Sequence, residues 1–156
     1  MAYERARAHL ERFGLADRIK LFDVSSATVE LAAQAVGCEP AHIAKTLSFL
    51  LPDGPVLIVA AGDARVDNSK YKARFHTKAK MLAFEEVEPL IGHAVGGVCP
   101  FGVNEGVPVW LDESLRRFDV VYPAAGTSNS AVELTLPELE QSSQALGWVD
   151  VCKDWA

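Results

Sequence analysis

Hydrophobic and polar positions along the chain alternate in two ways, which predict short helices and short strands in irregular order. Apolar residues recur every three or four positions in segments typical of amphipathic helices, and every two positions in segments typical of strands. The predicted helices are residues 3–13, 28–36, a short basic helix capped by Asp67, 84–92, 113–117 and 135–147. The predicted strands are residues 19–23, 44–51, a partner strand that ends at residue 61, 80–83, 108–111, 120–122 and 132–134. Ser26 or Thr28 can cap the second helix, and Gly37 can end it.

The segment AKTLSFLL, residues 44–51, places a lysine on the apolar face of a strand. With a period of two, Lys45 shares its face with Leu47, Phe49 and Leu51. Burying an ammonium group is costly, so this lysine either escapes to solvent at the end of the strand or points its amine into the interior. The Pro-Asp-Gly sequence at 52–54 is typical of a tight turn, so residues 44–61 are predicted to form a β-hairpin.

The order of these elements predicts an α+β fold. Strands joined in hairpins, with helices placed irregularly between them, favour a mixed, mostly antiparallel sheet that curls toward a barrel and is surrounded by helices. The chain has 156 residues, of which 49% are hydrophobic, and this is enough for one substantial core. No internal repeat, low-complexity run or linker divides it, so residues 1–156 are expected to form a single domain.

The formal net charge of −6 argues against a protein that holds nucleic acid by long-range attraction alone. The charge is uneven, however, because one segment contains a single acid, Asp67, among six basic residues. These are Arg65, Lys70, Lys72, Arg74, Lys78 and Lys80. Two interpretations are open: a solvated helix face whose inward side is formed by Tyr71 and Phe75, or a local basic patch on an acidic body.

The cysteines and the N-terminal segment indicate the compartment. Cys38, Cys99 and Cys152 are far apart and form no CxxC pair, so we expect reduced thiols. The first residues mix charges throughout and lack the apolar run of a signal peptide, and no stretch is long and apolar enough to span a bilayer. We therefore expect a cytoplasmic protein with no membrane partner.

Several common kinds of site are not indicated. The chain contains neither a GxxxxGKS loop nor a GxGxxG motif, so nucleotide phosphate chemistry is not expected. The four histidines, at positions 9, 42, 76 and 93, stand at no spacing typical of metal ligands, so we expect neither a metal nor a cofactor. Cys99 follows His93 by six residues and can be interpreted as a nucleophile with its base, but no flanking signature supports this. A thiol that lines a pocket is the favoured interpretation.

The glycine-rich loop GGVCPFG, residues 96–102, is a candidate binding element. Adjacent glycines before a proline let the backbone approach a ligand and direct consecutive N–H groups at one point, where an anion or a developing oxyanion can bind. A plain turn is the alternative, because glycine and proline are first of all turn residues. A second loop of small polar residues, AAGTSNS at 124–130, leads into the strand AVEL.

The ordered set HIAKTLSFLL, GHAVGGVCPFG, VWLDESL and AAGTSNSAVELT resembles the YbaK/EbsC family, free-standing relatives of the editing domain of bacterial prolyl-tRNA synthetase. Each motif alone is weakly specific, whereas their order is specific, and the resemblance extends from about residue 17 to the last helix. It implies a trans-editing aminoacyl-tRNA deacylase, which hydrolyses the ester of a small mischarged amino acid on tRNA, typically tRNA for proline. Members of the family use no metal and form no covalent intermediate.

The resemblance also assigns roles to residues. The family's catalytic lysine corresponds to Lys45, and its G-x-x-x-P substrate loop corresponds to residues 96–100. Backbone N–H groups of Gly97 and its neighbours would donate to the ester carbonyl, with a charged Lys45 as a further donor. The substrate-binding residues are expected to be Phe22, Gly96, Val98, Cys99, Pro100, Phe101, Gly126, Ser128 and Asn129. The basic cluster, rather than the resemblance, leads us to expect that the tRNA backbone contacts Lys70, Lys72 and Arg74.

Three positions differ from some members of the family. Phe22 replaces a tyrosine, Cys99 replaces a common serine, and Ala131 replaces an aspartate of the cysteine-removing members. These differences leave the reaction type unchanged and the removed amino acid open, with small acyl groups such as alanine, cysteine or serine expected. The expected partners are the acceptor end of a mischarged tRNA and an aminoacyl-tRNA synthetase. The alternative is a module that binds a tRNA acceptor end or a synthetase without hydrolysis.

Overall fold

A long β-hairpin forms the centre of the structure, a computed structural model that describes residues 2–155. Strands β2 (Ile43–Leu51) and β3 (Gly54–Ala61) pair in antiparallel register, with Lys45 opposite Ala60. The two residues between the strands, Pro52 and Asp53, form the turn. The hairpin predicted at residues 44–61 is therefore confirmed.

This hairpin lies in the middle of a curled sheet of six strands. The strand order is β8 (Leu134–Thr135), β6 (Val120–Pro123), β2, β3, β5 (Val109–Asp112) and β9 (Trp148–Val149). Strand β6 is parallel to β2, β5 to β3 and β9 to β5, whereas β8 is antiparallel to β6. Two further antiparallel pairs join β1 (Ile19–Leu21) to β7 (Ser130–Val132) and β4 (Arg65–Val66) to β10 (Cys152–Lys153). The curled, mixed sheet confirms the predicted α+β class.

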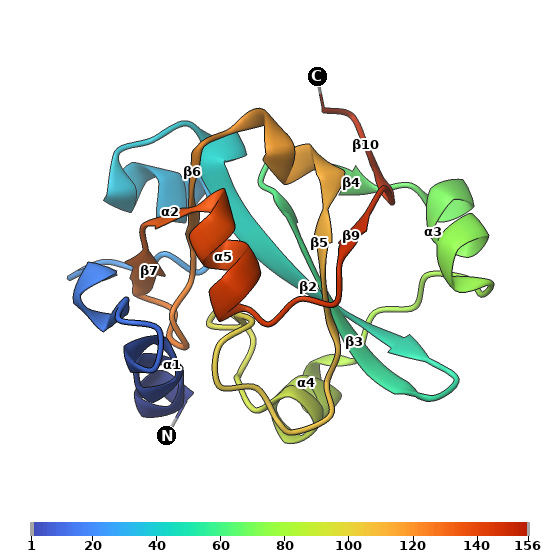
Figure 1. Ribbon diagram of the computed structural model, residues 1–156, viewed down its shortest axis with the longest axis horizontal. Coiled ribbons are helices and arrows are strands. Elements are labelled where there is room, and N and C mark those ends of the chain that lie inside the picture. Colours follow the sequence, from blue (N-terminus) through green and yellow to red (C-terminus); the bar gives the residue numbers. More distant parts are fainter. Residues whose placement is uncertain (1, 156) are drawn as a thin grey trace.

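Helices surround the sheet, and Figure 1 shows α2 and α3 at opposite sides of it. The α-helices of the described residues are α1 (Ala2–Glu11), α2 (Val29–Val36), α3 (Asn68–Phe75), α4 (Phe84–Ile91) and α5 (Leu136–Ser142). Short 3-10 helices are η1 (Ala16–Arg18), η2 (Pro40–His42) and η3 (Glu113–Arg117). The predicted caps are confirmed, because Thr28 Oγ1 accepts from the Leu31 N–H at the start of α2 and Asp67 Oδ1 accepts from the Ser69 N–H at the start of α3.

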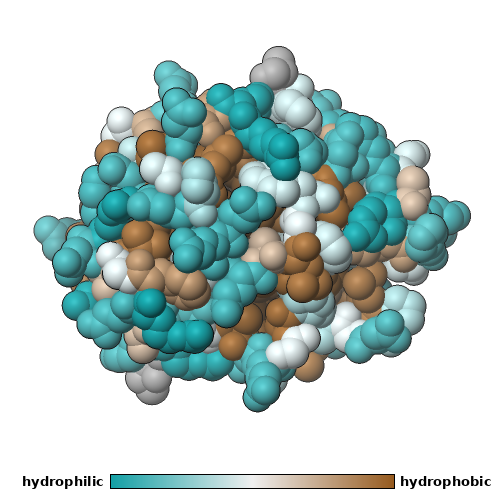
Figure 2. Space-filling model, in the orientation of Figure 1, coloured by the Kyte–Doolittle hydropathy of each residue, from teal (hydrophilic) through white to brown (hydrophobic). Residues whose placement is uncertain are grey.

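The core is centred on β3, whose residues 56–61 are fully buried. Such a continuous apolar run is typical of a central strand that is covered on both faces. Tyr71 is also fully buried, and its ring lies 5.1 Å from that of Phe49 and 4.9 Å from that of Phe75, which attaches α3 to β2. The predicted inward side of α3 is therefore confirmed. Figure 2 shows that hydrophilic side chains cover most of one outer face, with separate hydrophobic groups between them.

The strand predicted at residues 19–23 ends at Leu21, and two other predicted elements are shorter because a competing contact ends each of them. The strand predicted at residues 80–83 is reduced to one isolated bridge between Phe49 and Met81. The chain turns into α4 at Ala83, whose N–H donates to the Glu86 carboxylate. The helix predicted at 135–147 ends at Ser142, because the following segment pairs with β5 through the Leu146 N–H and the Gly147 carbonyl.

The strand predicted at residues 132–134 is divided between two partners. Residues up to Val132 pair with β1, and residues from Leu134 onward pair with β6. The chain therefore changes sheets at Glu133. The short strands β4, β9 and β10 were not predicted, because a two-residue segment has no detectable period.

Replacing Gly62 by alanine should destabilise the fold, because the backbone after β3 lies against η2 and α2. A Cβ atom at Gly62 would lie 2.1 Å from the Pro40 carbonyl oxygen and 2.8 Å from Val29 Cγ1. Overpacking of this kind costs about 1–3 kcal/mol, which urea denaturation would measure as a lower free energy of unfolding. The matched control is Gly147→Ala, whose Cβ would meet only the flat ring of Trp110, at 3.3 Å. Equal stability of the two variants would contradict this packing.

Candidate active site

A cavity of about 400 Å³ opens beside the first half of β2, and we call it the first cavity. Its wall is formed by α2, the start of β2, α4, the 95–98 segment, the end of β6 and β7. Most lining groups are apolar, and the polar ones are mainly hydroxyls, including those of Thr46, Ser48 and Ser130. The volume falls within the range of small-molecule sites.

Three of the residues assigned from the family resemblance line this cavity together: Lys45, Gly96 and Val98. Strand β2 also contributes Thr46 and Ser48, which have the opposite parity from Leu47 and Phe49 in the core. Lys45 shares the parity of the core residues, as the sequence indicated, and is half-buried. Its position lies between the two possibilities, because Lys45 is neither fully exposed nor fully buried.

The amine of Lys45 is held by backbone carbonyls of the turn that follows β3. Its Nζ donates a hydrogen bond to the Ala64 carbonyl and a longer one, of 3.5 Å, to the Gly62 carbonyl. An ammonium group has three N–H donors, so two acceptors leave one N–H for another partner. The direction of that donor is set by the position of the 62–64 turn.

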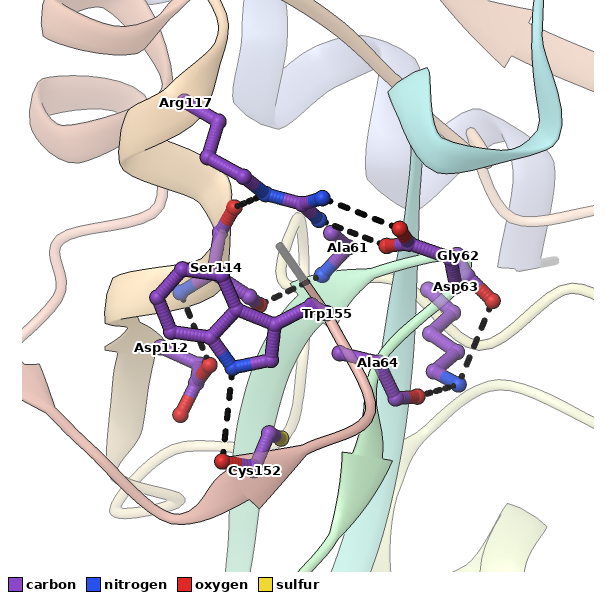
Figure 3. A network of polar contacts seen from close by, with 10 residues as sticks. Ala61, Gly62, Asp63, Ala64, Asp112, Ser114, Arg117, Cys152 and Trp155 are labelled. Atoms are coloured by element: carbon purple, nitrogen blue, oxygen red, sulfur yellow. Dashed lines mark hydrogen bonds and ion pairs between the residues drawn. The ribbon is translucent and has the colours of Figure 1, made fainter.

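The 62–64 turn is fixed in place by Arg117, as Figure 3 shows. The Arg117 guanidinium donates to both oxygens of Asp63, at 2.9 and 2.5 Å, and its Nε donates to the Ser114 carbonyl at 2.9 Å. The Ser114 hydroxyl in turn accepts from the Ala61 N–H at 3.1 Å, just before the turn. A two-pronged ion pair and a buried hydrogen bond therefore attach the turn to η3.

Behind the turn lies a buried carboxylate, Asp112. It accepts from the Ser114 N–H and the Val151 N–H, both at 2.9 Å, and it is inaccessible to solvent. Figure 3 shows Asp112 between Ser114 and Cys152, with the Trp155 indole nearby. The indole donates to the Cys152 carbonyl at 3.3 Å. These contacts join η3, β10 and the end of the chain into one support for the turn.

The surroundings of Lys45 include some groups that lower its pKa and others that raise it. Burial lowers the pKa of Lys45, and the charge of Arg65 also lowers it, whereas Cys152, Asp63 and Glu30 raise it. The net effect is a lowered pKa. At Asp63, the hydrogen bond from Arg117 lowers the pKa of the carboxyl, so Asp63 keeps its negative charge near Lys45.

The two loops singled out in the sequence pack backbone against backbone. A Cβ atom on Gly97 would lie 2.7 Å from the Gly126 carbonyl carbon and 2.8 Å from Thr127 Cα. A Cβ on Gly96 would contact Ser128 Cβ at 3.5 Å, and Gly96 has a φ of +96° that favours glycine. Glycine is therefore favoured at position 96 by its backbone conformation, and it is needed at position 97 for the loop to approach residues 126 and 127.

The N–H of Gly97 is already used within its own loop. It donates to the Ala94 carbonyl at 3.0 Å, which closes a turn. Among the described residues, the N–H groups of Gly96 and Val98 have no acceptor, and both residues line the first cavity. The donors available to a ligand are thus the neighbours of Gly97 rather than Gly97 itself.

The first strand and the second loop are joined at residues that the resemblance assigned to substrate binding. The Phe22 N–H donates to the Asn129 carbonyl at 2.9 Å, and Asn129 Nδ2 donates to the Phe22 carbonyl at 3.0 Å. Ser26 continues this contact, since its N–H donates to the Ser128 carbonyl at 2.6 Å. Phe22, Gly126, Ser128 and Asn129 support the wall of the cavity without lining it.

The second half of the glycine-rich loop enters the core. Cys99 and Phe101 are inaccessible to solvent, and Pro100 is buried. Cys99 Sγ lies 3.5 Å from His93 Nε2, the pair that the sequence offered as nucleophile and base. Burial raises the pKa of the Cys99 thiol to about 12 and lowers the pKa of His93, which leaves both groups neutral and out of reach of a substrate.

Two of the basic residues of α3, Lys70 and Arg74, have partners within the protein. Lys70 Nζ donates to Asp150 at 3.0 Å and to the Cys152 carbonyl at 2.9 Å. The Arg74 guanidinium lies 4.5 Å from the centre of the Trp110 ring. None of Lys70, Lys72 and Arg74 lines the first cavity.

Some lining residues were missed by reasoning from the sequence. Thr46 and Ser48 could have been found, because strand parity places them together on the face opposite Leu47 and Phe49. Residues from α2 and α4 have no such signal, since their apolar side chains are equally typical of an ordinary core. Within residues 2–155, no cluster of three or more His, Cys, Asp or Glu side chains could hold a metal ion. No helix in that range is long and apolar enough to cross a membrane.

Comparison with known sequences gives relatives of two kinds. The chain is 47% identical over 156 residues to the uncharacterized protein YwhH of Bacillus subtilis, with 99% of each chain covered. It is 28% identical over 131 residues to the proline–tRNA ligase of Leuconostoc mesenteroides, covering 83% of this chain but 22% of the ligase. The similarity to the ligase is thus confined to one part of that longer enzyme.

Comparison with solved structures gives the same grouping. A crystal structure assigned provisionally as a trans-editing enzyme for prolyl tRNA synthetase superposes with a TM-score of 0.87 and 32% identity over 97% of each chain. The hypothetical protein APE2540 superposes with a TM-score of 0.78 and 28% identity over 87% of this chain and 91% of the other.

The family described as the aminoacyl-tRNA editing domain matches residues 24–141. This range includes Lys45, Gly96 and Val98, which line the first cavity, and the 62–64 turn, which accepts hydrogen bonds from the Lys45 amine. The matched range, the full-length relative and the shared fold agree with the order of motifs in the sequence, and they show that this chain belongs to the aminoacyl-tRNA editing domain family.

Proposed function

We propose that this protein is a trans-editing aminoacyl-tRNA deacylase that hydrolyses the ester of a small mischarged amino acid on tRNA, with tRNA(Pro) as the expected acceptor. The observation that supports this most directly is the joint placement of Lys45, Gly96 and Val98 on one cavity of about 400 Å³. Membership of the editing-domain family supports the same reaction class. The similarity to one segment of a proline–tRNA ligase supports the choice of tRNA.

The proposed chemistry requires few groups. An aminoacyl ester is already activated, so orientation of a water molecule and stabilisation of the developing oxyanion are sufficient. The third N–H of the Lys45 ammonium and the N–H groups of Gly96 and Val98 are the donors that the geometry leaves available. In this role Lys45 acts as a charge and a donor, and the two carbonyls that accept from it favour the charged form.

The lining of the first cavity supports a small acyl group. A synthetase gains only about 1–3 kcal/mol of discrimination per methylene, so a second site that admits smaller amino acids is needed for accuracy. The lining combines apolar side chains with the hydroxyls of Thr46, Ser48 and Ser130. This wall suits alanine, serine or cysteine better than a long or charged side chain.

A panel of mischarged tRNAs tests the proposal and identifies the amino acid. The purified protein should release small amino acids from tRNA(Pro) and leave prolyl-tRNA intact. Lys45→Ala should reduce the rate constant by about 10²-fold or more, because a preorganised donor to the oxyanion is lost. The matched control Lys20→Ala removes an exposed lysine, half-accessible beside Glu133, and should keep full activity.

Two outcomes would contradict the proposal. Full activity of Lys45→Ala would remove the lysine from the mechanism. Tight binding of tRNA(Pro) without hydrolysis of any ester in the panel would favour a binding module for a tRNA acceptor end or a synthetase instead.

Replacing Asp63 by asparagine separates two possible roles of Lys45, that of a charged hydrogen-bond donor and that of a neutral general base. The Asp63 charge raises the pKa of Lys45, so its removal lowers that pKa further. If the charged lysine is the active form, activity is lost as the pH rises through the pKa, and Asp63→Asn moves this loss to lower pH. If a neutral lysine is the base, the variant gains activity at the same pH. We expect the loss, measured as a pH profile of kcat/KM, with Asp53→Asn in the hairpin turn as the unchanged control.

A further inference from the structure

A second cavity, of about 810 Å³, lies on the other side of the glycine-rich loop. One wall is a face of α1 formed by Arg5, His9 and Arg12, which are spaced at i, i+4 and i+7 and therefore lie in a row. The opposite wall is formed by residues 102–109 and by the segment that follows α5. Lys45 does not line this cavity, so it is separate from the candidate active site.

The guanidinium of Arg5 is held in a fixed position on this wall. Its Nη2 donates to Asn104 Oδ1 at 3.1 Å and its Nη1 donates to the Gly92 carbonyl at 3.4 Å. Asn104 is fixed in turn, because its Nδ2 donates to the Pro89 carbonyl at 2.9 Å. Both acceptors of Arg5 are neutral, and a guanidinium has five N–H donors, so charge and donors are left for a ligand.

Neither arginine of this cavity has a carboxylate partner among residues 2–155, although the chain is acidic overall. Arg12 lies over the Phe13 ring at 5.8 Å from its centre, and this is a contact with an aromatic face, not with a charge. Three of the other six arginines are neutralised: Arg18 pairs with Glu138, Arg116 with Glu113 and Arg117 with Asp63. Two unneutralised guanidinium groups on one cavity indicate an anionic ligand.

Two histidines near this cavity, His9 and His93, have a lowered pKa, and the positive charge of the arginines contributes to it after burial. Burial is the main cause of the lowered pKa of His9, and the Arg12 charge lowers it further. Burial likewise lowers the pKa of His93, with additional contributions from Arg5 and His9. No carboxylate offsets these effects at either ring within the described residues. The only acid that lines the cavity is Glu105, which is exposed.

The lining also includes a group of apolar side chains, Pro100, Val103, Val107, Pro108 and Leu146. Leu146 is 64% exposed although it is a large hydrophobic residue, so it presents an uncovered apolar surface at the cavity. A ligand with one anionic end and one flat, weakly polar face matches this combination. A cavity of this volume is large enough for such a ligand.

We propose that the second cavity binds a phosphate-bearing nucleotide. Arg5 and Arg12 bind the phosphate group, Asn104 and Gln144 are the amides within reach of polar edges, and the apolar wall receives the base. The nucleotide comes either from an RNA strand or from a free mononucleotide, and these sources share the same chemistry. Recognition by guanidinium groups is independent of a phosphate-binding loop, which the sequence lacks.

The position of the cavity relates it to the first one. Gly96 and Val98 line the first cavity, and Pro100 of the same loop lines the second. A nucleotide in the second cavity would therefore contact the loop that contributes to the candidate active site. The RNA source rests on the proposed function, whereas binding of a mononucleotide can be measured without any aminoacyl ester.

The test is direct binding of AMP, adenosine and inorganic phosphate to the full chain, measured by calorimetry and by chemical shifts of α1. AMP should bind at least tenfold more tightly than adenosine, and inorganic phosphate should compete with it. Arg5→Gln and Arg12→Gln should each weaken AMP binding about tenfold, the loss expected for one charged contact. Arg7→Gln is the matched control, since Arg7 is exposed on the same helix but does not line the cavity.

Arg12→Gln keeps the test free of folding effects, because the Arg12 side chain makes no hydrogen bond among the described residues. The thermal transition of this variant should therefore be unchanged. Repeating the titration with the trinucleotide CCA separates the two sources. Tighter binding of CCA than of AMP, with the same dependence on Arg5 and Arg12, supports an RNA strand, and the reverse order supports a free mononucleotide. Absence of binding by both ligands, or equal binding by the wild type and the Arg5→Gln, Arg12→Gln double variant, would overturn the proposal whatever the outcome of the deacylation panel.

Discussion

The hydrogen bonds from the Lys45 amine to two backbone carbonyls are the interaction on which the candidate active site depends. A lysine at the start of a central strand is a half-buried charge, which proteins seldom tolerate without compensation. The Gly62 and Ala64 carbonyls provide that compensation, and they do so without neutralising the charge. The fold can therefore hold an ammonium group beside an apolar cavity.

The carbonyls are useful only if the turn that presents them is rigid. Asp63 lies between them in sequence and is held at both oxygens by Arg117, which is itself attached to the Ser114 carbonyl. Gly62 allows the turn to approach η2 so closely that no side chain fits there. The support extends to Asp112, whose buried carboxylate connects η3 with the segment before β10. Residues distant in sequence thus determine where one lysine amine points.

The sequence predicted the elements with a clear period and the order of the motifs. The 44–61 hairpin, the caps at Thr28 and Asp67, the buried face of α3 and the α+β class are present in the structure. The sequence also placed Lys45 on the same strand face as Leu47 and Phe49. Each of these predictions depends on local pattern or on a resemblance that covers most of the chain.

The sequence could not reveal features that arise from contacts between distant segments. The acceptors of the Lys45 amine are backbone atoms, which have no identity in a sequence, and Asp63 gives no sign of its pairing with Arg117. The use of the Gly97 N–H within its own turn is equally invisible, although the loop itself was recognised. The second cavity combines α1 with residues about 90 to 140 positions later, so only the folded chain brings Arg5 and Arg12 against that apolar wall.

The proposed role of Lys45 requires a charged amine, and NMR of the lysine side-chain nitrogen measures the ionisation state of that amine directly. The Nζ resonance of Lys45 is identified in the isotope-labelled protein by its absence from the Lys45→Arg variant. It is then followed through a pH titration of the free protein. We expect an amine that is protonated at pH 7 and titrates below the ordinary lysine value of 10.5, because burial outweighs the nearby acceptors and negative charges. A neutral Lys45 at pH 7 would contradict its role as a charged donor, and an unshifted pKa would contradict its placement against the interior.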